Sequence, residues 1–379
     1  MEPTLALCMI VKNEEKVILR CLKSVKIFID YWVIIDTGST DRTMELIREE
    51  LSEIPGVLLE SPFVNFAHNR TEYMQKVRGL TDYCIFMDAD EVLINNGFSK
   101  SQLVKDCYKV GYLGATDYYF PAIFRTALEW RYEHVVHEYP VCDAPYESDY
   151  IETLKKNHLH DGGMRYEKFD RDIRLISEEL KKAPDDARYT FYLANSYWCI
   201  GNYALALQWY DRRIKLNGWE QEVYISALRA GLCAIELKHT EASIEDYFMR
   251  AMSAVPLRHE AYYHIGVYYN REGYYALAYA YLMAAKQLKY PKQQLFFERD
   301  IYDHLLDIEL AVSMYWIGLY KEAADINRNL LKRGIKKELI TANLKYCEDK
   351  LKSSIFTLSK EPNDEPVGTS DTDIDNIGD

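Results

Sequence analysis

Short apolar runs alternate with helical periodicities along residues 1–165. Four runs of consecutive apolar residues are expected to form strands: Leu5–Val11, Trp32–Ile35, Val57–Leu59 and Cys84–Met87. Between them, apolar residues recur at helical spacing, first at Ile18, Cys21, Leu22 and Val25 and later at Met44, Ile47 and Leu51. Strands that are apolar throughout and are separated by helices predict a mostly parallel sheet covered on both faces.

The pattern changes after residue 165, where almost every segment has helical periodicity. A first apolar stripe is followed by a repeat, in which one set of small and aromatic residues returns 72 positions later, from residue 194 to residue 266. The first set is Ala194, Tyr197, Gly201, Tyr203, Ala206 and Tyr210, and the second is Gly266, Tyr269, Gly273, Tyr275, Ala278 and Leu282. Two units of about 36 residues are close to the tetratricopeptide period of about 34. We therefore expect stacked helical hairpins and a capping helix near 337–351.

Three domains follow from this change of pattern. Residues 1–165 are predicted to form the α/β domain and residues 166–355 an all-α repeat domain. Residues 356–379 are predicted to be a disordered acidic tail, because the chain has no Lys or Arg from Glu361 onward.

Charge and cysteine usage exclude several function classes. The formal net charge is -13 and no basic cluster is present, so a nucleic-acid partner is not expected. The eight cysteines include no CxxC pair, which argues against a zinc or redox motif and predicts free thiols. The N-terminus lacks a basic flank, and no apolar run approaches the ~20 residues that cross a bilayer. We expect a cytoplasmic protein without a membrane span.

Two acidic motifs stand at predicted strand ends, where ligands bind in open α/β sheets. Asp88 and Asp90 follow the fourth strand at i and i+2, so both carboxylates can face one point. Such a pair suits a hard cation, which would neutralise a diphosphate leaving group. Asp36 ends the second strand and could accept a hydrogen bond from a base or a ribose hydroxyl. The alternatives are solvated turn acids at Asp88 and Asp90 and a helix-capping acid at Asp36.

Six segments together resemble glycosyltransferase family 2, which has the GT-A fold. They are Met9–Glu15, Val33–Thr43, Phe66–Arg70, Asp82–Glu91 with its DxD motif, Arg131–Glu138 and His158–Gly163. The branch of this family with a C-terminal tetratricopeptide array resembles nearly the whole chain apart from the tail. The resemblance implies an inverting, metal-dependent transferase that moves a sugar, with a hexose expected, from a nucleoside diphosphate sugar.

The resemblance also implies roles for individual residues. The nucleoside pocket would be lined by Val11, Asn13, Glu14 and Asp36. Asp88 would lie near the ribose or sugar, and could share the metal, Mn²⁺ or Mg²⁺, that Asp90 holds. His160 would be a further ligand of the metal or the diphosphate; a plain surface histidine is the alternative. Arg70 would contact the diphosphate or sugar unless it serves only in an ion pair.

The general base is expected in the segment that follows residue 131. Glu138 is the first candidate and Asp143 the second. Glu138 could instead be a structural partner of Arg125 or Arg131.

The predicted function is transfer of a sugar, with a UDP-sugar favoured, to a peptide, protein or glycan acceptor. The helical repeats would present that acceptor or form a homodimer. One alternative is a tetratricopeptide binding protein whose transferase-like domain no longer turns over. A nucleotidyltransferase is disfavoured because Met9–Glu15 lacks the Gly-rich, Arg-containing loop of that class, and no phosphate-loop motif is present.

Overall fold

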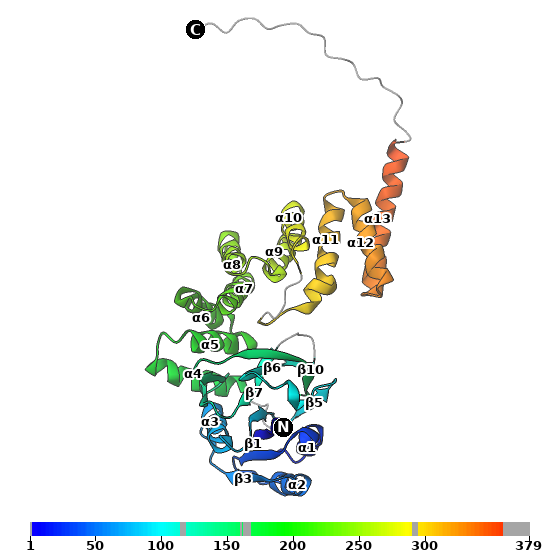
Figure 1. Ribbon diagram of the computed structural model, residues 1–379. Helices are drawn as coiled ribbons and strands as arrows, with labels where there is room; N and C mark the ends of the chain where they lie inside the picture. Colours follow the sequence, from blue (N-terminus) through cyan, green and yellow to red (C-terminus); the bar gives the residue numbers. More distant parts are fainter. Residues whose placement is uncertain (1, 114–118, 160, 162–167, 290–294, 359–379) are drawn as a thin grey trace, which may run out of the picture. The chain divides into compact units, whose positions relative to one another are not determined.

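The computed structural model describes residues 2–113, 119–159, 161, 168–289 and 295–358 (Figure 1). The chain forms two compact units. The first contains residues 1–265 and 284–303, and the second contains residues 266–283 and the described residues from His304 onward. The predicted boundaries at residues 165 and 355 stay predictions, and the predicted tail lies almost wholly outside the described residues.

An eight-stranded sheet forms the centre of the N-terminal region, with the strand order β3-β2-β1-β4-β7-β6-β10-β5. These strands are β1 (Leu5–Val11), β2 (Tyr31–Asp36), β3 (Gly56–Glu60), β4 (Tyr83–Phe86), β5 (Glu91–Asn95), β6 (Cys107–Tyr112), β7 (Tyr119–Arg125) and β10 (Ser148–His158). The first four strands pair in parallel, and β10 pairs in parallel with β6. Antiparallel pairing occurs at β7 and at β5. A small second sheet joins β8 (Trp130–Glu133) to β9 (Tyr139–Cys142).

The predicted α/β elements are confirmed. The helices of this region are α1 (Ile18–Val25), α2 (Thr43–Glu50) and α3 (Phe66–Val77), with short 3₁₀ turns at Lys26–Phe28 and Lys100–Gln102. β1, β2 and β4 are almost completely buried, which explains why these strands are apolar in nearly every position.

The predicted helical repeats are confirmed as well. In chain order the helices are α4 (Lys168–Lys182), α5 (Ala187–Cys199), α6 (Tyr203–Leu216), α7 (Glu220–Glu236), α8 (Glu241–Ala254), α9 (His259–Glu272), α10 (Tyr275–Lys286), a π-helical turn (Ile301–Leu305), α11 (Leu306–Trp316), α12 (Tyr320–Lys332) and α13 (Lys337–Leu358). α13 covers the predicted capping helix. No helix in the described ranges is long and apolar enough to cross a bilayer.

Glycine is required at two kinds of position in these hairpins. Gly201 and Gly273 lie between paired helices with φ of 75° and 82°, a conformation that other residues rarely adopt. Gly266 permits a close helix crossing, since a Cβ at this position would lie 2.6 Å from Cγ of Leu282. The repeated small residues therefore reflect turn geometry and helix packing.

Candidate active site

Hydrogen bonds join the loops that follow β1 and β2. Val11 O accepts from the backbone N–H of Thr37 at 2.9 Å, and Asn13 Oδ1 accepts from that of Thr40 at 2.8 Å. Glu14 donates its backbone N–H to Thr43 Oγ1 at 2.7 Å. The structure therefore brings Val11, Asn13 and Glu14 beside the loop that Asp36 begins.

Asp36 is buried, and only one of its two carboxylate oxygens accepts hydrogen bonds from the described residues. Oδ1 accepts the backbone N–H groups of Gly38 at 2.9 Å and Ser39 at 2.8 Å. Oδ2 is buried and has no hydrogen-bond partner within the part of the chain that the structure describes. A buried carboxylate oxygen without a donor is costly, so this atom fits a ligand that brings an N–H or O–H group. The helix-capping alternative is not what is observed, because Asp36 accepts from Gly38 and Ser39, which precede α2, and the first N–H of α2 donates to Asp41 instead.

Arg70 connects two acids that lie 50 positions apart in the sequence. Its NH2 group donates to Asp88 Oδ1 at 2.8 Å, and its Nε lies 3.0 Å from Glu138 Oε1 as a close ion pair. The guanidinium also lies 4.8 Å from the centre of the Phe86 ring. The partner of Glu138 is thus Arg70. It is neither Arg125 nor Arg131, the two arginines considered from the sequence.

The pKa of Glu138 depends on its enclosed position, because the side chain is only 11% exposed. Burial raises the pKa of this carboxyl above its ordinary value, and the nearby Asp88 acts in the same direction. The positive charges of Arg70 and Arg188 counteract part of that rise. A carboxylate with a raised pKa has more affinity for a proton, which is the property required of a general base.

A buried ion pair supports the turn that carries Asp88. Lys156 Nζ lies 2.9 Å from Glu91 Oε2, and the two side chains are 1% and 0% exposed. The same Glu91 oxygen accepts the backbone N–H of Asp88 at 3.0 Å, and the other accepts the Tyr112 hydroxyl at 2.8 Å. Sequence reasoning included Glu91 in the motif without a role of its own, and it missed Lys156 and Tyr112. The available signal was that Lys156 stands two positions after Leu154 in a strand, so that both side chains point to the same, buried face of the sheet.

Asp90 lies on the other side of this turn, where His158 Nε2 is 2.9 Å from Asp90 Oδ2. This hydrogen bond raises the pKa of His158. The predicted ligand His160 lies outside the described residues. Asp90 and His158 are both of metal-ligand type, but no group of three or more His, Cys, Asp or Glu among the described residues could hold a metal ion.

A cavity of about 450 Å³ opens beside the Arg70, Asp88 and Glu138 side chains. Its lining contains Arg70, Asp88 and Glu138, together with residues of α5 and of the segment before the π-helical turn. The full lining is Arg70, Phe86, Asp88, Tyr112, Phe120, His137, Glu138, Arg188, Tyr192, Leu295 and Phe296. Asp143 is not brought to this cavity. It lines a different one, of about 660 Å³, and its carboxylate pairs with Arg131 at 2.8 Å.

A comparison with known families matches the part of the sequence that carries these residues. The family model described as glycosyl transferase family 2 matches residues 6–170, which include the first-strand loop, the Asp88–Glu91 turn and Glu138. Residues 6–170 are therefore a glycosyl transferase family 2 domain.

Two curated relatives match different shares of the chain. The SPbeta prophage-derived glycosyltransferase SunS of Bacillus subtilis is 25% identical over 263 residues, which are 62% of this chain and 59% of that protein. A TPR repeat-containing protein of Synechococcus elongatus is 36% identical over 101 residues, 26% of this chain and 24% of that protein. The chain thus matches less than two thirds of the length of either relative.

Two solved structures of helical proteins resemble the chain distantly. A crystal structure of MamA has 16% identity and a TM-score of 0.35, and it covers 50% of this chain and 91% of its own. A tetratricopeptide repeat protein from Parabacteroides merdae has 13% identity and a TM-score of 0.37, with coverage of 50% and 70%. At these scores the likenesses add nothing to the fold described above.

Proposed function

We propose that the protein transfers a sugar from a nucleoside diphosphate sugar to a hydroxyl or thiol of a peptide, protein or glycan. The observation that carries the proposal is the Asp88–Arg70–Glu138 arrangement in one cavity of a glycosyl transferase family 2 domain. This arrangement places a buried acid with a raised pKa beside a second acid that follows a parallel strand.

Glu138 is the proposed general base. The acceptor oxygen or sulfur attacks the anomeric carbon while the bond from that carbon to the diphosphate breaks, and the diphosphate leaves with the bonding electrons. Glu138 takes the proton that the acceptor loses. A single displacement of this kind inverts the configuration at the anomeric carbon. Arg70 keeps Glu138 oriented and offsets the repulsion between its charge and that of Asp88.

The donor is proposed to lie along the loops after β1 and β2. The unpartnered Oδ2 of Asp36 would accept an N–H of the base or a ribose hydroxyl, and a uracil imide N–H suits this atom. Val11, Asn13 and Glu14 would form the rest of the nucleoside pocket. Asp90, with His158 or His160 as a further ligand, would hold Mn²⁺ or Mg²⁺, which would neutralise the diphosphate charge.

Calorimetric titration tests the donor site without knowledge of the acceptor. UDP is titrated into the wild-type protein with and without Mn²⁺, and into Asp36→Asn and Asp90→Ala. We expect metal-dependent binding of UDP by the wild type. We expect Asp90→Ala to lose the metal dependence and Asp36→Asn to weaken binding by about tenfold, as for the loss of one hydrogen bond of 1.4 kcal/mol. If UDP does not bind under either condition, the binding-protein alternative is favoured.

A further inference from the structure

The segment that carries Glu138 has an unusual backbone. His134 and His137 have φ of 73° and 54°, in the left-handed region that residues other than glycine rarely adopt. Between them, the Val136 side chain is only 3% exposed. A segment that adopts two such conformations must be held by its surroundings. The contacts that hold it come from outside the sheet.

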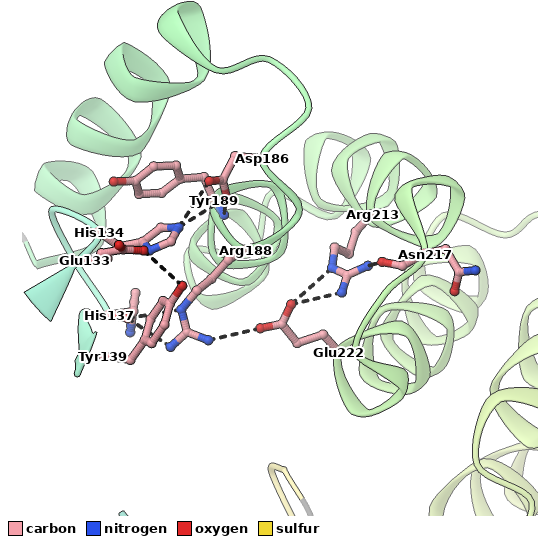
Figure 2. A network of polar contacts seen from close by, with 10 residues as sticks. All are labelled: Glu133, His134, His137, Tyr139, Asp186, Arg188, Tyr189, Arg213, Asn217 and Glu222. Atoms are coloured by element: carbon pink, nitrogen blue, oxygen red, sulfur yellow. Dashed lines mark hydrogen bonds and ion pairs between the residues drawn. The ribbon is translucent and has the colours of Figure 1, made fainter. Parts of the chain in front are cut away.

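Helix α5, the second helix of the helical region, and its N-cap residue Asp186 supply four of these contacts. Figure 2 shows two of them, between His134 and Asp186 and between His137 and Arg188. His134 Nε2 lies 3.2 Å from Asp186 Oδ2, and Val135 donates its backbone N–H to the Tyr189 hydroxyl at 3.0 Å. The His137 carbonyl accepts from Arg188 NH2 at 3.0 Å. The His137 ring also stacks on Tyr192, with centroids 3.7 Å apart and an 8° interplanar angle.

The apolar side chain of the segment also packs against the helical region. Val136 belongs to an apolar cluster whose other buried members all come from α4 and α5: Ile176, Leu180, Tyr189 and Leu193. The residue that precedes Glu138 by two positions is therefore part of the core of the helical region.

Arg188 is itself held in place by a chain of ionic contacts, which Figure 2 shows from α5 to α7. Its NH1 lies 3.3 Å from Glu222 Oε1, and the other oxygen of Glu222 accepts from Arg213 NH2 at 3.0 Å. Arg213 is 1% exposed and donates further to the Asn217 carbonyl at 2.6 Å. Arg188 also packs over the Tyr139 ring at 4.7 Å, on the far side of Glu138. The guanidinium thus contacts the residue before Glu138 at its carbonyl and the residue after Glu138 at its ring.

We propose that α5 belongs to the active site and that Arg188, braced by Glu222 and Arg213, is a positioning residue for the candidate base Glu138. This inference rests on the proposed function. It means that the glycosyl transferase family 2 domain alone lacks an ordered base, because the geometry of Glu138 depends on the first repeat helices.

Steady-state hydrolysis of a nucleotide sugar tests the proposal, because water can take the place of the unidentified acceptor. UDP-glucose and Mn²⁺ serve as first probes, followed by other UDP-sugars, with the full chain throughout. The variants are Arg188→Met, Arg188→Lys and Glu222→Gln. Arg212→Met is a matched control, since Arg212 likewise contacts a carbonyl, a carboxylate and an aromatic ring, at an exposed site.

We expect Arg188→Met to lower kcat at least tenfold while KM and the UDP dissociation constant change less than twofold. Arg188→Lys should recover part of kcat, Glu222→Gln should show a smaller loss, and Arg212→Met should match the wild type. An unchanged kcat in Arg188→Met, or an equal loss of kcat and UDP affinity, overturns the positioning role.

Hydrogen exchange keeps the inference testable apart from turnover. In Arg188→Met we expect at least tenfold faster exchange of the backbone amides of residues 134–139, with exchange in β1 and β4 unchanged. If no donor is cleaved but this exchange responds, the proposed function fails and the hold of α5 on the segment stands. If exchange in residues 134–139 is unchanged, the inference itself is wrong.

Discussion

The two acids of the cavity are anchored in different ways. Asp88 lies on a turn after β4, and its backbone N–H donates to Glu91, which forms a buried ion pair with Lys156. Glu138 lies on a segment with two left-handed residues, and side chains of α5 hold that segment. One half of the site is thus built by strands of one sheet. The other half depends on helices that begin 30 or more residues after Glu138 in the sequence.

The proposed hold of α5 on the Glu138 segment would give the glycosyl transferase family 2 domain and the helical repeats a reason to form one chain. Parallel strands deliver the Asp36 and Asp88 carboxylates to one edge as a consequence of topology. Glu138 lies outside the large sheet, in the connection between β8 and β9, and α5 contacts that connection. Four predictions test this contrast.

The largest effect is expected from Glu138→Gln. Loss of a general base typically costs about 10²–10⁴-fold in rate, so we expect kcat of donor hydrolysis to fall by that factor with little change in KM. Asp143→Asn is the matched control, since Asp143 follows five positions later and pairs with Arg131 outside the cavity. Equal losses in the two variants would reassign the base.

The second prediction concerns the support of Asp88. Lys156→Met leaves Glu91 buried without its partner, which costs about 3–5 kcal/mol in the free energy of unfolding. Denaturant unfolding, monitored through the loss of the sheet, measures this decrease in the free energy of unfolding. The double variant Lys156→Met, Glu91→Gln should regain part of the stability, because no unpaired charge is left buried. A single variant as stable as the wild type would show that the pair does not anchor the turn.

A third, smaller effect is expected at the support of Glu138. Tyr189→Phe removes the acceptor of the Val135 N–H and keeps the ring in the apolar cluster. The loss is about 1 kcal/mol, seen as a lower unfolding midpoint. Tyr203→Phe in the neighbouring α6 is the control. A midpoint equal in both variants would contradict the role given to Tyr189.

The sequence revealed the sheet half of the site far better than the helical half. The position of a strand end can be inferred from periodicity, and the residues at or just after apolar strand ends are Val11, Asn13, Glu14, Asp36, Asp88 and Asp90. The partnership of Arg70 with Glu138 could not be inferred, because it depends on how α3 meets a segment 68 positions away. Arg188 and Lys156 were missed for the same physical reason. Their roles arise from contacts across elements; Arg188 leaves no local pattern, and Lys156 leaves only its inward position in the alternation of its strand.

The smallest effect is a shift of the pH profile. Glu138 accepts a proton only when it is ionised, so activity should fall as the pH drops through its pKa. Burial raises that pKa, so the acidic limb of kcat should lie above the pH at which an ordinary glutamate titrates. Arg188→Met removes a charge that lowers the pKa and should move the limb upward. Arg70 and Asp88 are the other charged groups that act on Glu138, and Arg212→Met should leave the limb in place. A limb below the ordinary glutamate range would contradict the assignment of Glu138.

Cleavage of a donor tests the proposed sugar transfer most directly. Purified protein with Mn²⁺ is mixed with each common nucleotide sugar, and the slow release of nucleoside diphosphate is measured for the wild type and for Asp90→Ala. We predict that at least one donor, with UDP-sugars first, is cleaved by the wild type and that Asp90→Ala loses most of this activity. Absence of cleavage for every donor, or equal cleavage by the variant, would contradict a metal-dependent glycosyltransferase.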